Sequence, residues 1–427
     1  MAFLKLSNRR GNWLSALTLV TAWTCASLLS LAHASPPAQA QDHARWIATW
    51  TASPQPLFSA DAGLDPGIPT SLSDQTVRQN MKVSVGGRGV RIVLSNAYGK
   101  APLIIGEARV ARSAGGATIV RGSDRPLTFG GEARVVIPPG APAISDPVEL
   151  EVPALSELSV SLYIPEPTPL DTFHWSGQQT GYLTAGNFTS AESLAPSATF
   201  TARLFVSAAL VASNWRTRVV AAFGDSITDG SSATLDSNQR WPDLFAQRVA
   251  PSGVGVINAG ISGNQLLLDG MGVNAVARFE RDVLSQPGVE SAIVLIGIND
   301  IGGFWSGSTP SHTELIAGYR QLIAQAHSRG VRILGATITP FEGALEEFAD
   351  GFYTPEKELL RTSVNDWIRS SGEFDAFVDF DLALRDPSRP TRINPAYDSG
   401  DRLHPNDAGY RAMADAVHLG ALVRGRR

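Results

Sequence analysis

Residues 219–228 read VVAAFGDSIT, an apolar run that ends in a glycine and a polar turn. The run 219–223 is typical of a strand in a parallel sheet that is covered on both faces. Gly224 ends the run, and Ser226 follows at the carboxyl end of the predicted strand, where open α/β sheets bind ligands. Ser and Asp are also common helix caps, so Ser226 taken alone is either a nucleophile or a cap.

Two further predicted strands lead to residues that can stabilise a developing negative charge. Residues 254–258 read VGVIN and lead to Gly263, and residues 293–298 read IVLIGI and lead to Asn299. Acyl transfer develops an oxyanion, which preorganised donors such as a backbone N–H or a side-chain amide stabilise. Either residue alone is more simply a turn residue. The functional interpretation depends on their occurrence together with Ser226.

A base for the serine is available far downstream, where the chain reads DRLHP from Asp401. A serine hydroxyl is a weak nucleophile and needs an adjacent base. His404 can accept the serine proton, and Asp401 can orient the imidazole and stabilise the imidazolium. A spacing of three residues lets both side chains leave one tight turn in the same direction. The sequence therefore predicts a catalytic triad of Ser226, His404 and Asp401.

These segments together resemble the GDSL, or SGNH, hydrolase family over about residues 217–422. That family carries Ser in Gly-Asp-Ser, Gly in a second block, Asn in Gly-x-Asn-Asp, and Asp and His in Asp-x-x-His; the matching residues here are Ser226, Gly263, Asn299, Asp401 and His404. The resemblance implies a serine esterase whose oxyanion hole comprises the N–H groups of Ser226 and Gly263 and the Asn299 amide, with no metal or organic cofactor. The competing α/β-hydrolase elbow requires Gly-x-Ser-x-Gly, which occurs nowhere in this chain.

From residue 218 onward, apolar strands alternate with amphipathic helices. Strands are expected near residues 218–223, 254–258, 291–297, 331–337 and 376–380, and helices near 239–250, 272–285, 312–329, 356–371 and 405–422. The alternation predicts an α/β fold, a three-layer α/β/α domain of the flavodoxin-like type with a mainly parallel, doubly wound sheet. Asp415 and His418 repeat the spacing of the triad pair. We expect them to be a surface pair on one face of the last helix.

Residues 44–214 differ from the rest of the chain. Short runs of alternating polarity recur there between turn residues, for example 81–85, 90–94, 134–137 and 158–163. This patterning predicts a β-sandwich or jelly-roll domain over residues 44–214, followed by the catalytic domain over residues 215–427. The join at 212–217 is short and unlike a flexible linker, so we expect Trp215 to be buried between the two domains.

The first 34 residues have the features of a secretory signal peptide. Basic residues precede the largely apolar stretch 14–31, and Ala32-His33-Ala34 is a cleavage site, with a second candidate ending at residue 40. The stretch is long enough for a membrane anchor, but its Ser and Thr residues favour cleavage. We therefore expect a secreted or periplasmic protein without stable membrane insertion. The single cysteine, Cys25, lies in this segment, so the mature chain would contain no disulfide.

Composition limits the class of partner. The chain has 427 residues, 43% of them hydrophobic and 18% charged, with a formal net charge of −5. These values are typical of globular proteins, and an acidic chain without a basic stripe is a poor nucleic-acid binder. The expected partner is an ester substrate, and the oligomeric state is not indicated.

The nature of the ester follows from a narrower resemblance. A β-domain that opens with WIATWTASPQ at residues 46–55 and precedes a GDSL domain resembles the xylan-esterase-like branch of the family. That resemblance implies removal of acetyl groups from a carbohydrate such as xylan. A general short-chain carboxylesterase or lipase is the first alternative, and an inactive carbohydrate-binding protein is the second.

Overall fold

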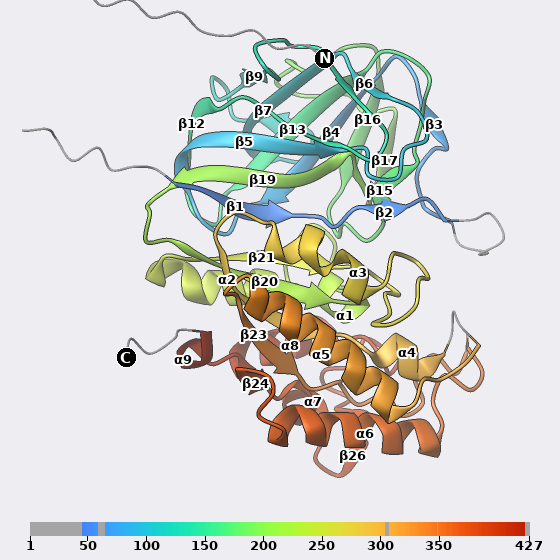
Figure 1. Ribbon diagram of the computed structural model, residues 1–427. Helices are drawn as coiled ribbons and strands as arrows, with labels where there is room; N and C mark the ends of the chain where they lie inside the picture. Colours follow the sequence, from blue (N-terminus) through green and yellow to red (C-terminus); the bar gives the residue numbers. More distant parts are fainter. Residues whose placement is uncertain (1–44, 59–64, 304–306, 348, 423–427) are drawn as a thin grey trace, which may run out of the picture. The chain divides into compact units, whose positions relative to one another are not determined.

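The C-terminal region is built on a parallel sheet (Figure 1). The computed structural model describes residues 45–58, 65–303, 307–347 and 349–422, so the expected signal peptide and Cys25 lie outside the described residues. The sheet has the order β21-β20-β22-β23-β24, and each neighbouring pair is parallel. Its strands are β20 (Arg218–Gly224), β21 (Val254–Gly260), β22 (Val289–Leu295), β23 (Arg332–Ala336) and β24 (Ala376–Val378). All five strands expected from the sequence are confirmed.

Helices occupy the segments between these strands. The longer ones are α2 (Trp241–Val249), α3 (Ala275–Phe279) with the π-helical turn η3 (Glu280–Leu284), α5 (His312–Ser328) and α6 (Pro355–Ser370). Short helices are α1 (Ser226–Asp229), α4 (Ile298–Gly302) and α7 (Phe380–Leu384), and a small hairpin pairs β25 (Arg385–Asp386) with β26 (Arg389–Ile393). The first four expected helices are confirmed, and the expected three-layer stacking stays a prediction.

The last expected helix, over residues 405–422, is wrong as a single element. The structure has α8 (Asp407–Ala416) and then α9 (Leu419–Leu422). Arg248 of α2 donates to the carbonyl oxygens of Ala414 and Val417. The guanidinium thereby satisfies carbonyl groups that a continuing helix would have bonded itself, and the helix ends there.

Two smaller expectations are also wrong. His418 lies after the end of α8, so it does not share a helix face with Asp415. Asp415 Oδ1 instead lies 3.8 Å from Arg248 Nη1. Trp215 is not buried, because 57% of it is exposed and its ring packs against the neighbouring Arg216.

The N-terminal region is rich in antiparallel strands. One sheet contains β1 (Arg45–Thr51), β19 (Val206–Ser213), β5 (Gly87–Ser95), β11 (Pro142–Ile144) and β12 (Val148–Val152). A second contains β17 (Ala198–Phe200), β16 (Gly181–Ala185), β4 (Gln75–Lys82), β13 (Glu157–Ile164), β7 (Glu107–Gly115), β8 (Thr118–Ile119) and β9 (Arg125–Leu127). Smaller groups are β18 (Arg203–Leu204) with β15 (Thr172–His174) and β2 (Gln55–Pro56), β10 (Val135–Ile137) with β6 (Leu103–Ile105), and β14 (Thr168–Pro169) with β3 (Ser71–Leu72).

The β-rich character of this region is confirmed, and the strands expected at 90–94, 134–137 and 158–163 are present with shifted ends. Its classification as a β-sandwich or jelly roll stays a prediction, as do the domain boundaries at residues 214 and 215. The strand expected at 81–85 is displaced, because β4 ends at Lys82. Arg78 in β4 is buried and donates to Ser161 Oγ at 2.8 Å and to the Ala117 carbonyl at 2.8 Å. A buried polar residue of this kind interrupts the alternation of polar and apolar residues from which a strand is predicted.

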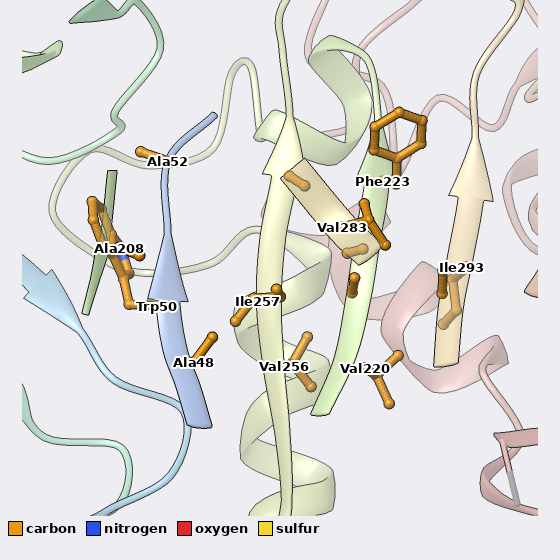
Figure 2. Packing of buried hydrophobic residues seen from close by; sticks show 14 of the residues in the cluster. Ala48, Trp50, Ala52, Ala208, Val220, Phe223, Val256, Ile257, Val283 and Ile293 are labelled. Carbon is orange, nitrogen blue, oxygen red and sulfur yellow. The ribbon is translucent and has the colours of Figure 1, made fainter. Parts of the chain in front are cut away.

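β1 packs along β21, so the two regions share one hydrophobic core (Figure 2). Ala48 and Ile257 are both buried in this contact, at 0% and 1% exposure. Two polar contacts fix the seam: Thr51 Oγ1 donates to the Asn258 carbonyl at 2.7 Å, and the Ala48 N–H donates to the Pro287 carbonyl at 2.8 Å. All described residues belong to a single compact unit.

Candidate active site

Ser226 is the first residue of α1, directly after β20. Asp225 caps this helix, with Oδ1 accepting from the Ile227 N–H at 3.0 Å. The turn is tight: a Cβ atom on Gly224 would lie 2.2 Å from the Leu295 carbonyl oxygen. Glycine is therefore required at position 224, and the short strand-to-helix turn places Ser226 at the carboxyl end of the sheet.

His404 connects Ser226 to Asp401. Its Nε2 lies 2.8 Å from Ser226 Oγ, and its Nδ1 lies 2.5 Å from Asp401 Oδ2. An ionised carboxylate can only accept, so Nδ1 carries the proton and leaves Nε2 free to accept the serine proton. The structure thus brings together three residues that lie up to 178 positions apart in the sequence.

Asp401 is held in its anionic form. Its Oδ1 accepts from the backbone N–H groups of Leu403 at 2.9 Å and His404 at 2.8 Å. Burial alone would raise the pKa of Asp401, but the hydrogen bonds and charge of His404 outweigh burial and hold that pKa well below its usual range. An anionic Asp401 stabilises the positive charge that His404 acquires on accepting a proton.

The three expected oxyanion donors lie on adjoining segments. Gly263 has φ 73°, in the left-handed region that favours glycine, and its N–H meets no acceptor among the residues the structure describes. The Asn299 amide donates one hydrogen bond to the Asn264 carbonyl at 3.0 Å and retains a second N–H. Ser226, as the first residue of its helix, has no intrahelical acceptor for its N–H.

The loop that carries Gly263 is tied to both neighbouring strands. The Ile261 N–H donates to the Gly224 carbonyl at 3.1 Å. Arg278, which is buried, donates to the Gly224 and Ala259 carbonyls at 2.8 Å each and to Asn264 Oδ1 at 2.8 Å. Sequence reasoning missed Arg278, because an arginine on an amphipathic helix is ordinarily a surface residue.

Two buried carboxylates flank the proposed catalytic residues. Burial raises the pKa of Asp225 to about 7 and that of Asp300 to about 6. Asp300 accepts from the N–H groups of Leu266 at 2.7 Å and Leu267 at 3.0 Å. Both carboxylates are held by backbone N–H groups, so they organise the loops around Ser226 and Asn299.

Two hollows lie near the candidate residues, one beside Asp401 and one beside Asp300. A cleft of about 290 Å³ lies beside Asp401 and is lined by Ser232, Gly343, Leu345, Glu346, Glu347, Ser399, Gly400, Asp401 and Arg402. A larger cavity of about 610 Å³ includes Asp300, next to Asn299, and has Leu267, Leu268 and Val276 in its wall. The residues that line the cleft beside Asp401 are mainly polar, whereas those that line the larger cavity include both polar and apolar side chains.

Among the described residues, no group of His, Cys, Asp or Glu side chains has the arrangement of a metal site. Within the same residues, no helix has the length and hydropathy needed to cross a membrane.

Known proteins resemble the C-terminal region. Structures similar to about half of the chain include a carbohydrate acetylesterase from Sinorhizobium meliloti (21% identity, 47% of this chain and 96% of that one, TM-score 0.38) and an aryl esterase from M. smegmatis (17%, 48% and 100%, TM-score 0.40). An acetyl xylan esterase is similar at 21% identity over 46% of this chain and 96% of that one, with a TM-score of 0.35. No curated protein matches the chain.

A similarity to a known family is found at the level of sequence. Residues 222–412 match the model of the GDSL-like lipase/acylhydrolase family. The matched segment runs from the end of β20 to α8 and includes Ser226, Asn299 and His404. Residues 222–412 are therefore similar to the GDSL-like lipase/acylhydrolase family.

Proposed function

We propose that the protein is a serine esterase that hydrolyses carboxylic esters. The observation that carries the proposal is the continuous contact from Ser226 Oγ to His404 Nε2 at 2.8 Å and from His404 Nδ1 to Asp401 Oδ2 at 2.5 Å. This is the arrangement that nucleophilic catalysis by serine requires. An inactive binding protein would have no need of such an arrangement, so the geometry favours an enzyme.

In the proposed mechanism, Ser226 Oγ attacks the ester carbonyl carbon while His404 Nε2 takes the hydroxyl proton. The tetrahedral oxyanion accepts hydrogen bonds from the N–H groups of Ser226 and Gly263 and from the Asn299 amide. His404 then protonates the leaving alcohol, and an acyl-enzyme remains on Ser226. Water, deprotonated by His404, attacks the acyl-enzyme, and His404 returns the proton to Ser226 Oγ as the acid is released. No step needs a metal or an organic cofactor.

Acetylated carbohydrate is the substrate class that we propose. The cleft beside Asp401 is lined by hydroxyl and charged groups, including Ser232, Glu347 and an ion pair of Arg402 with Glu346 at 2.5 Å. Such groups suit the hydroxyls of a sugar. Secretion or export to the periplasm, expected from the first 34 residues, suits a polymeric substrate.

A general short-chain carboxylesterase is the second candidate. The observation that favours it is the larger cavity near Asn299, with Leu267, Leu268 and Val276 in its wall. Apolar side chains of this kind suit an acyl chain or an apolar alcohol better than a sugar.

One set of assays separates these candidates. The purified protein and Ser226→Ala are compared on acetylated xylan and on p-nitrophenyl esters of increasing acyl length. We expect activity on both acetate substrates, a decline with longer chains, and none in Ser226→Ala. Activity that rises with acyl length and is absent on acetylated xylan would favour the second candidate. Undiminished activity in well-folded Ser226→Ala would overturn the serine mechanism.

A further inference from the structure

A second histidine–carboxylate pair links the β-rich region to the segment that carries Gly263. His174, the last residue of β15, places Nε2 3.0 Å from Asp229 Oδ1 and Nδ1 3.1 Å from the Ser53 carbonyl oxygen. The two side chains are only 6% and 1% exposed. Asp229 is the last residue of α1, the helix that begins with Ser226. The pair therefore joins the two regions directly behind the proposed nucleophile.

Both ring nitrogens of His174 face oxygen atoms. A carbonyl oxygen can only accept a hydrogen bond, so Nδ1 carries a proton that it donates to Ser53. Contact at Nε2 requires a second proton, either on the ring or on the carboxyl group. Burial opposes ionisation of Asp229, yet the charge and hydrogen bond of His174 hold the pKa of Asp229 below its usual range. Because both ring nitrogens contact acceptor oxygens, the geometry fits a ring that carries a proton on each nitrogen beside a carboxylate.

The other oxygen of Asp229 fixes the residue before Gly263. Asp229 Oδ2 accepts from the Ser262 N–H at 2.9 Å and from Ser262 Oγ at 2.8 Å. The N–H of Gly263 belongs to the peptide group that joins it to Ser262. The two hydrogen bonds hold the backbone nitrogen and the side chain of Ser262, the residue from which that peptide extends, and so limit the directions that the Gly263 N–H can take.

The contact with His174 affects how strongly Asp229 accepts hydrogen bonds from Ser262. Without the imidazolium, a carboxylate that is 1% exposed would lose its closest cation and bind a proton more readily. A neutral carboxyl group accepts weaker hydrogen bonds than a carboxylate. The hydrogen bonds from Ser262 to Asp229 would weaken, although Ser226, His404 and Asp401 would be unchanged.

We infer that His174 is a positioning residue for the oxyanion hole, acting through Asp229 and Ser262 on the N–H of Gly263. The inference rests on the proposed esterase function. It gives the β-rich region a part in the reaction: that region supplies the cation that orients an oxyanion donor in the hydrolase domain.

The test is steady-state kinetics of His174→Ala on p-nitrophenyl acetate, per mole of folded protein. A misdirected donor weakens transition-state binding more than substrate binding, so kcat should fall ~10- to 100-fold while KM stays within about twofold. His327→Ala is the matched control. His327 Nε2 also contacts a carboxylate, Asp375 Oδ2, at 3.1 Å, but Asp375 directly precedes β24 at the amino end of the parallel sheet, whereas Ser226 follows the carboxyl end of β20. We expect the control to retain the parent kcat.

A double-variant cycle tests the route. Ser262→Ala removes the Oγ contact and keeps the backbone N–H. If His174 acts through Ser262, the combined variant should lose less than the product of the two single losses. Multiplicative losses would overturn the proposed route, and an unchanged kcat in His174→Ala would overturn the inference.

Two further variants keep the test decisive. If His174→Ala does not fold, Asp229→Asn replaces it, because the amide keeps the shape of the side chain and removes its charge. Asp229→Asn should show the same fall in kcat. An unchanged kcat in this variant would count against the inference. Ser226→Ala in the same assay separates the two proposals. An inactive Ser226→Ala beside a fully active His174→Ala would overturn the inference alone, whereas an active Ser226→Ala would overturn the esterase mechanism.

Discussion

The turn at Asp401–His404 and the contact between His174 and Asp229 contain the same pair of side chains in different surroundings. In the first, Nδ1 contacts the carboxylate and Nε2 faces Ser226 Oγ at 2.8 Å. In the second, Nε2 contacts the carboxylate and Nδ1 contacts a backbone carbonyl. The side chains are 14% and 23% exposed in the first pair and 6% and 1% exposed in the second.

The difference shows that the partner of the second nitrogen decides what such a pair can do. His404 has one nitrogen that can accept a proton and then give it up, which a general base requires. His174 has both nitrogens in contact with acceptor oxygens, so it has no nitrogen free to accept a proton. The first pair is equipped for proton transfer, and the second for holding structure in place.

The most severe test of this contrast is His404→Ala. Removing the base should lower kcat by ~10⁶-fold if the residues act as one unit. The measurement is hydrolysis of p-nitrophenyl acetate, with thermal unfolding as the check that the variant folds. If His404→Ala lost no more activity than His174→Ala, the two pairs would not differ in the way that we describe.

Asp401→Asn sharpens the contrast within the first pair. An amide in place of the carboxylate favours the wrong tautomer of His404 and no longer stabilises its positive charge, so kcat should fall by ~10⁴-fold. The kinetics are measured as for His404→Ala. Near-parental kcat in a folded Asp401→Asn would show that His404 does not depend on Asp401.

Asn299→Ala examines an oxyanion donor that lies in α4, on a different segment from the Gly263 peptide. Loss of one oxyanion donor typically costs ~10²–10³-fold in kcat, and KM should change little because the contact strengthens only in the transition state. A rise in KM at constant kcat would instead make Asn299 a contact to the bound substrate.

The smallest effect that we expect concerns stability. Burial raises the pKa of Asp225 from 3.8 to about 7, with opposing contributions from the Ile227 N–H and His404. Between these values the folded protein holds a proton that the unfolded chain has released, so this contribution to stability is complete below pH 3.8 and is lost as the pH rises through about 7.

Asp225→Asn removes that dependence. The Tm of the variant minus the Tm of the parent should be larger at pH 8 than at pH 5. The increase should be ~2–4 °C for each kcal/mol of unfolding free energy that the parent loses between these pH values. Differential scanning calorimetry of both proteins at the two pH values checks this. An equal Tm difference at both values would mean that Asp225 ionises in the folded state much as it does in the unfolded chain.

Sequence patterns predicted the hydrolase region well because its strands are continuous apolar runs that end in recognisable turns. The run before Ser226 and the spacing of Asp401 and His404 were sufficient to anticipate which residues the structure brings together. Their catalytic roles stay a prediction. The β-rich region was harder, because β4 buries polar side chains such as Arg78, whose partners are distant carbonyl and hydroxyl groups.

No sequence pattern indicated the contact between His174 and Asp229. These residues are separated by 55 positions, belong to no shared motif, and meet only because β15 lies against the end of α1. The early end of α8 was missed for a similar reason, since its cause is Arg248 on another helix. Local pattern predicts elements, whereas contacts between distant elements depend on the assembled fold.

The placement of β1 has a consequence for the order of events during synthesis. This strand pairs with β19, where Arg45 lies opposite Ser213, and its other side packs on β21, which ends at Gly260. Partners so distant in sequence make folding slow, because a long loop must close before the contacts form. Residues 45–51 can therefore pair with β19 only after residue 213 has been synthesised, and they acquire their full native surroundings only after residue 260.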